Sequence, residues 1–190
     1  MERAELLEII EFGEIGRLRK AIESGFAQGP IFEGAPTALG LACHAGWMEG
    51  IEALLPHSDI EEEGAKGMAP LMCAALGGWH GALARMLQAG AGWTGRDNVG
   101  NSALGLAALG CFCESMSEDG DERGKRLEEV HACLMELLPL LDLDEENHGG
   151  KTPRSLLEEA GDQKLLAMVE QWEIGQKTAE ASIQGIRRRI

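Results

Sequence analysis

The feature that most constrains the fold of this chain is an internal repeat. The segments TALGLACHAGWMEGIEALL and APLMCAALGGWHGALARML align with each other, and SALGLAALG begins a third copy. The three copies start at Thr37, Ala69 and Ser102, so their spacings are 32 and 33 residues (69 − 37 and 102 − 69). A fourth copy starts at Thr152, and a degenerate one surrounds Gly13. A period of this length is typical of chains that stack small units rather than fold around one central core.

Each copy predicts the same local structure. Apolar residues such as Leu39, Ala42 and Cys43 predict a short first helix, which a glycine ends. A second helix follows, with apolar residues such as Met48 and Ile51 on one face, and a polar, glycine-containing loop closes the unit. We therefore predict an all-α repeat of helix–turn–helix units joined by hairpin-like loops. The predicted units are 1–33, 34–66, 67–98, 99–148 and 149–172, followed by a C-terminal tail at 173–190.

The repeated residues resemble those of ankyrin repeats. The period, starts similar to Thr-Pro-Leu, the Ala-x-x-Gly turn, the paired leucines and the closing Gly-Ala together carry the resemblance, which covers roughly residues 1–172. The resemblance implies an ankyrin-type solenoid that binds proteins through its loop tips and first helices. The usual histidine of the start motif is absent, and Ala69 replaces the usual threonine, so we expect the array to depend on apolar stacking between neighbours. A helical array of another type is the alternative. The residues that replace the histidine are Gly40, Met72, Gly105 and Ser155.

The fourth unit carries an insertion near 111–129, because its successor starts 50 residues after Ser102. The polar, glycine-containing middle of this stretch predicts an exposed loop, after which KRLEEVHACLMELL predicts a helix again. Cys111, Cys113, His131 and Cys133 border it, and three thiolates with an imidazole are a ligand set that zinc accepts. Against zinc, positions i and i+2 of one helix point apart, which separates His131 from Cys133. Packed or loop thiols are therefore the preferred interpretation, and we predict no cofactor.

Charge separates the classes of partner. The chain has 32 acidic residues against 17 lysines and arginines, a net charge of −15. Such a chain repels nucleic acid, whereas a basic protein would associate with it faster. The alternative is that the surplus acid only keeps the protein soluble. No apolar stretch reaches the roughly 18 residues of a membrane span, and the N-terminus has no signal-peptide pattern. We expect a cytoplasmic protein, with the nucleus as the alternative.

The predicted loop tips supply the candidate partner-binding residues. Trp93 stands out because tryptophan is enriched among interface hot spots. Trp47 and Trp79 share one repeat position and are predicted to pack between neighbouring units, while Trp172 is predicted to cover the last unit. Two acidic triplets lie on the predicted edge and would receive a basic segment by charge complementarity. The full candidate set is His57, Asp59, Glu61, Glu62, Glu63, Trp93, Arg96, Asp97, Asn98, Asp144, Glu145 and Glu146.

The sequence therefore predicts a protein–protein interaction module, monomeric on its own, that recognises, sequesters or inhibits one protein partner. Two alternatives stay open: a chaperone-like escort of a basic client protein, and a structural subunit of a larger assembly. We predict no enzymatic activity, because no nucleotide-binding loop or metalloprotease motif occurs and a Cys–His nucleophile near 111–131 has no recognisable third group.

Overall fold

The structure of the chain is a computed structural model, which describes residues 3–25, 35–115 and 120–187. Every regular element in these ranges is a helix, so the predicted all-α class is confirmed. The first three units contain α1 (Arg3–Glu11) with α2 (Ile15–Glu23), α3 (Ala38–Ala45) with α4 (Met48–Leu54), and α5 (Pro70–Gly77) with α6 (His80–Gln88). The last two contain α7 (Ala103–Ser115) with α8 (Gly120–Leu137), and α9 (Pro153–Ala160) with α10 (Gln163–Arg187). Two short 3-10 helices, η1 (Leu55–His57) and η2 (Ala65–Gly67), lie between α4 and α5.

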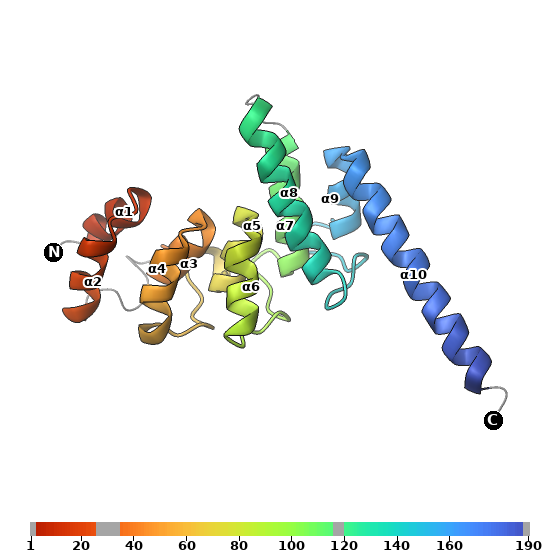
Figure 1. Cartoon of the computed structure of the whole chain (residues 1–190), viewed down its shortest axis with the longest axis horizontal. Coiled ribbons are helices and arrows are strands. Elements are labelled where there is room, and N and C mark those ends of the chain that lie inside the picture. Colours follow the sequence, from red (N-terminus) through yellow and green to blue (C-terminus); the bar gives the residue numbers. More distant parts are fainter. Residues whose placement is uncertain (1–2, 26–34, 116–119, 188–190) are drawn as a thin grey trace.

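The helix pairs stack side by side in chain order (Figure 1). The first helices form one row, in which α1, α3, α5, α7 and α9 each contact the next. The second helices form a parallel row from α2 through α4 and α6 to α8. Because each unit contacts chiefly its sequence neighbours, the apolar core is a continuous strip between the two rows rather than a central cluster.

Capping explains where the first helices begin and end. The Thr37 hydroxyl accepts a hydrogen bond from the Gly40 amide at 3.0 Å, and Thr152 forms a reciprocal capping box with Ser155. Ala69, which replaces the usual threonine, makes no such side-chain hydrogen bond. Pro70 occupies the first position of this helix instead. Among the first helices, α3, α5 and α9 end at glycines in the left-handed conformation, for example Gly46 at φ 66°.

Tryptophans pack between neighbouring units, as the sequence predicts for Trp47 and Trp79. A β-carbon added to Gly46 would lie 2.3 Å from the Trp79 ring, so the ring lies directly against the end of α3. The Trp79 indole donates a hydrogen bond to the His44 carbonyl at 3.0 Å, and the Arg126 guanidinium lies 3.7 Å from the centre of the ring. Trp172 is half-buried against the apolar core.

Hairpin turns join the units and pair with one another. In each turn a backbone amide donates a hydrogen bond to the carbonyl four residues later: Gly64 to Met68 at 3.1 Å, Asp97 to Asn101 at 3.0 Å, and Asn147 to Lys151 at 2.9 Å. Successive turns are then linked. The Asn98 amide donates to the Lys66 carbonyl at 2.8 Å, and the His148 amide donates to the Val99 carbonyl at 2.9 Å. The turns are 33 and 50 residues apart, so they repeat with the spacing of the sequence copies.

Most of the insertion near 111–129 is helix and not the predicted loop, and residues 116–119 in its middle lie outside the described residues. α7 continues to Ser115 and α8 already begins at Gly120, so the extra residues lengthen both helices of the fourth unit. The expectation was wrong because a polar composition marks exposure and not the absence of a helix. Leu127, Val130 and Leu134 recur at helical spacing and turn one face of α8 toward the core.

The predicted boundary at residue 172 lies inside a helix. α10 runs without interruption from Gln163 to Arg187 and extends away from the stack (Figure 1). The side chains of residues 174–181 are exposed, and those of Ile183, Ile186, Ile190 and Arg187–Arg189 lie outside the described residues. Within the described parts of the chain, no helix combines the length and the apolar character needed to cross a membrane.

Candidate binding groove

Two adjoining cavities lie between the first helices and the hairpin turns. The first has a volume of about 190 Å³ and the second about 320 Å³, and both are lined by Lys66, Met68 and Leu76. We call the two together the first-helix groove. Its other lining residues are Pro36, Gly40, Leu41, His44, Ala65 and Cys73 in the first cavity, and Asp97, Asn98, Val99, Asn101, Leu106 and Leu109 in the second.

The repeat itself places side chains in this groove. Counting from the start residue of each copy, position +4 is Leu41, Cys73 and Leu106, and position +7 is His44, Leu76 and Leu109. Residues three apart lie on one face of a helix, so these two positions make one stripe on each first helix. Three successive units align their stripes beside the hairpin turns. The groove is therefore a product of the whole stack and not of one unit.

The groove is mainly apolar. Val99 is 55% exposed at its rim, and Lys66 contributes a cation from the tip of a turn. Lys66 lies in the turn with a left-handed φ of 59°. Its carbonyl accepts a hydrogen bond from the Asn98 amide of the next turn.

Asp97 lines the groove but is not a free recognition residue, which corrects the prediction. Its side chain is buried, and one oxygen accepts from the amides of Val99 at 3.0 Å and Asn101 at 2.8 Å. The other oxygen accepts from the Asn101 side chain at 2.9 Å. These bonds fix the hairpin turn, so Asp97 shapes the groove from inside the protein. Asn98 occupies the exposed tip of the same turn.

The other predicted tip residues lie before the turns rather than at their tips. The tips are residues 65–66, 98–99 and 148–149, whereas Glu61, Trp93 and Asp144 belong to segments that lead from the second helices to the turns. Glu61 accepts a hydrogen bond from the Gly92 amide at 2.7 Å, which ties two neighbouring segments together. Trp93 is exposed.

Several of the predicted acids already have partners within the chain. Asp144 forms two hydrogen bonds with Arg154, at 2.6 and 3.2 Å, which hold the pKa of the Asp144 carboxyl below its usual value. Glu145 pairs with Arg96. Asp59 accepts from the Glu61 amide at 2.9 Å. Among the described residues, the structure records no ion pair for Glu62, Glu63 and Glu146, so these are the acids available to a partner.

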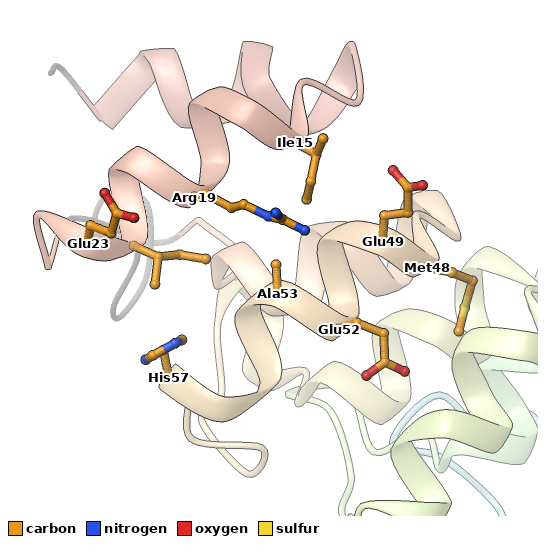
Figure 2. Close-up of a pocket in the computed structure, with 9 residues that line it drawn as sticks. Ile15, Arg19, Glu23, Met48, Glu49, Glu52, Ala53 and His57 are labelled. Atoms are coloured by element: carbon orange, nitrogen blue, oxygen red, sulfur yellow. The ribbon is translucent and has the colours of Figure 1, made fainter.

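A second groove lies between α2 and α4 on the opposite row of helices (Figure 2). Its volume is about 680 Å³. His57, which the sequence places at a loop tip, lines this groove instead. Figure 2 shows Arg19 reaching into this second-helix groove from α2, with Ala53 on α4. The rim carries mixed charge, because Arg19 lies beside three acids. The remaining lining residues are Ile15, Ile22, Glu23, Met48, Glu49 and Glu52.

The predicted metal ligands are only partly brought together. Cys113 is exposed, whereas Cys133 is fully buried and its pKa is raised to about 12 by that burial. Cys111 and His131 do lie close together, and Asp162 joins them: one ligand atom from each lies within 4.8 Å of the others. Sequence reasoning missed Asp162, because it lies 31 residues beyond His131 in the next unit and only stacking brings it near.

Comparison with known proteins adds no family to this description. The chain matches no model of a protein family, and a search of curated proteins finds no match to its sequence.

Proposed function

We propose that the chain is an ankyrin-type repeat protein that binds a segment of another protein in the first-helix groove. The ankyrin assignment is supported by the repeated residues together with the paired helices and the hairpin turns that follow the same period. The observation that carries the binding function is that equivalent helix positions in three successive units line one apolar groove.

The groove favours a partner segment with apolar side chains. Leu41, Leu76 and Leu109 offer half-buried apolar surface from three successive units, and Val99 is exposed beside them. Burying such surface is the main favourable term in protein association. The net charge of −15 would speed the approach of a partner with basic flanks, and this effect would weaken as salt rises. Binding of this kind needs no catalytic group, and we propose none.

The test is a comparison of two variants with the same chemistry at different places. Peptides selected from a display library on the wild-type protein would be measured for binding to Val99→Asp and to Ile174→Asp. Both residues are apolar and exposed, 55% and 63% respectively, but only Val99 lines the groove. We expect Val99→Asp to weaken binding at least about tenfold, the size of an interface hot-spot effect, and Ile174→Asp to leave it unchanged.

The same pair of variants would then be used in affinity capture from the native lysate, to identify the natural partner. Loss of one protein with Val99→Asp and its retention with Ile174→Asp would name the partner of the groove. Equal binding by both variants, for the peptides and for the captured protein, would refute the proposed site.

The escort of a basic client is a second candidate, favoured by Glu62, Glu63 and Glu146. These acids have no ion-pair partner among the described residues and lie outside the first-helix groove. Replacing all three with glutamine would separate the two functions. If the client is recognised by charge, capture should fall in this variant and should also fall steeply with salt. A partner recognised by the groove should survive the triple replacement.

A further inference from the structure

A buried cluster of three potential metal ligands lies where α7, α8 and α10 meet. Cys111 of α7 is fully buried, His131 of α8 is 5% exposed, and the side chain of Asp162, just before α10, is 13% exposed. One ligand atom from each residue lies within 4.8 Å of the other two. Three ligating side chains from three elements therefore converge in a place that water reaches poorly.

The hydrogen bonding of His131 is incomplete. Its Nε2 atom lies 2.6 Å from an Asp162 carboxylate oxygen, but its Nδ1 atom is buried and has no hydrogen-bond partner among the described residues. A neutral ring that donates to Asp162 leaves a lone pair unsatisfied, and a protonated ring leaves a donor unsatisfied. Buried polar atoms in proteins are nearly always paired, so the contact with Asp162 does not by itself satisfy the buried His131 ring.

We propose that Cys111, His131 and Asp162 bind a divalent transition metal of the zinc class. A thiolate, an imidazole and a carboxylate are the three donor types that Zn²⁺ accepts, and water would complete a tetrahedral set. Harder cations such as Mg²⁺ and Ca²⁺ take oxygen ligands, so they do not fit a site with sulfur and nitrogen donors. Binding would release the thiol proton of Cys111 to solvent as the metal–sulfur bond forms.

The position of the cluster gives the metal a structural role. Cys111 and His131 belong to the two helices that the insertion lengthens. The second oxygen of Asp162 accepts from the Leu165 amide at 3.1 Å and so caps the start of α10. A metal bound here would tie the fourth unit to the long terminal helix. This site is independent of the first-helix groove, since none of its three residues lines that groove.

The test uses the full chain and Co²⁺ as a spectroscopic stand-in for zinc. Titration of the reduced, metal-free protein should give a thiolate-to-cobalt absorption band that saturates at about one ion per chain, and zinc should displace it. Added zinc should also raise the temperature of unfolding. Cys111→Ser should abolish the band, and His131→Asn should weaken cobalt binding at least about tenfold, since loss of even a supporting group costs that much.

Cys113→Ser is the matched control, because it removes an exposed thiol only two residues from Cys111. It should bind cobalt and respond to zinc like the wild type. Absence of a saturable thiolate band in the folded wild-type protein would overturn the proposal, whether or not the variants fold. Loss of the band in Cys113→Ser would also overturn it, because the ligands would then be those that the sequence alone groups together.

Discussion

The contact between Gly46 and Trp79 gives a sharp prediction for the stacking of units. Gly46 ends α3 at a φ of 66°, and an alanine β-carbon there would lie 2.3 Å from the nearest ring atom of Trp79. The ring has little freedom to move, because its indole N–H bonds to the His44 carbonyl and Arg126 lies over it. Gly46→Ala should therefore combine a conformational cost with a steric one.

The magnitude follows from separating the two costs. A left-handed conformation costs a residue with a β-carbon about 1–2 kcal/mol, and overpacking costs about 1–3 kcal/mol more. Gly161 provides the control: it ends α9 at a φ of 68°, and an added β-carbon would meet nothing within 4 Å. We expect Gly161→Ala to lower the free energy of unfolding by about 1–2 kcal/mol and Gly46→Ala by about 2–5 kcal/mol.

The assay is urea denaturation followed by the helical circular dichroism signal, with Trp79→Ala as a second background. Removing the ring removes the clash, so Gly46→Ala should cost about 1–2 kcal/mol in Trp79→Ala protein, the same as Gly161→Ala. Equal effects of the two glycine replacements in the wild-type background would refute the reasoning. Such equal effects would mean that Trp79 does not lie against the end of α3 and that α6 is not stacked on the preceding unit through this contact.

Three further outcomes are expected. Asp97→Ala should destabilise the chain by about 1–3 kcal/mol in urea denaturation, because it leaves buried amides of the turn unsatisfied, whereas Asn98→Ala should change stability by less than about 0.5 kcal/mol. Burial raises the pKa of Cys73 to about 12 from 9.0, so this thiol stays protonated in the folded state while it ionises in the unfolded state. The contribution of this protonated thiol to the free energy of unfolding is therefore full below pH 9 and is lost as pH rises toward 12, at about 1.4 kcal/mol per pH unit. Cys73→Ala should therefore lose stability less steeply than the wild type over this alkaline range. The Arg154 guanidinium lowers the pKa of the exposed Asp144 carboxyl, so the small difference in stability, below about 1 kcal/mol, between wild type and Asp144→Asn should vanish as acid protonates Asp144.

The helix pairs could be predicted from the sequence because their signals are local. Apolar spacing and closing glycines occur within each copy, and the period relates one copy to the next. The same local signals place Trp47 and Trp79 against their neighbours, because the two residues occupy one repeat position. The limits of the long helices were not predictable in this way. The polar first part of α8 is typical of a loop, although a helix with one apolar face tolerates such residues.

The hairpin turns lie a few residues beyond the segments that composition predicts as loop tips. The polar and acidic residues after the second helices predict loop tips at segments such as Glu61–Glu63. Composition, however, does not fix where a chain reverses its direction. The turn has its own signal: Asp97 and Gly100 recur as Asn147 and Gly150, each pair three residues apart. The acceptor side chain binds the amides of the turn, and the glycine takes a positive φ. That spacing marks the tips correctly.

The insertion shows how the stack absorbs extra residues without losing its geometry. Trp47 lies against Gly13 and Trp79 against Gly46, and in the fourth unit Val130 takes the same place against Gly78. Arg126 donates to the Gly77 carbonyl, much as the Trp79 indole donates to His44. The contact between a second helix and the turn of the preceding unit is thus kept although the intervening chain is longer. Figure 1 shows the paired ends of α7 and α8 projecting beyond the neighbouring helices, while the turn at 97–101 stays in line with the others. Because the added length leaves both the core strip and the first-helix groove in register, it adds a surface at the far end of this unit and does not interrupt the groove.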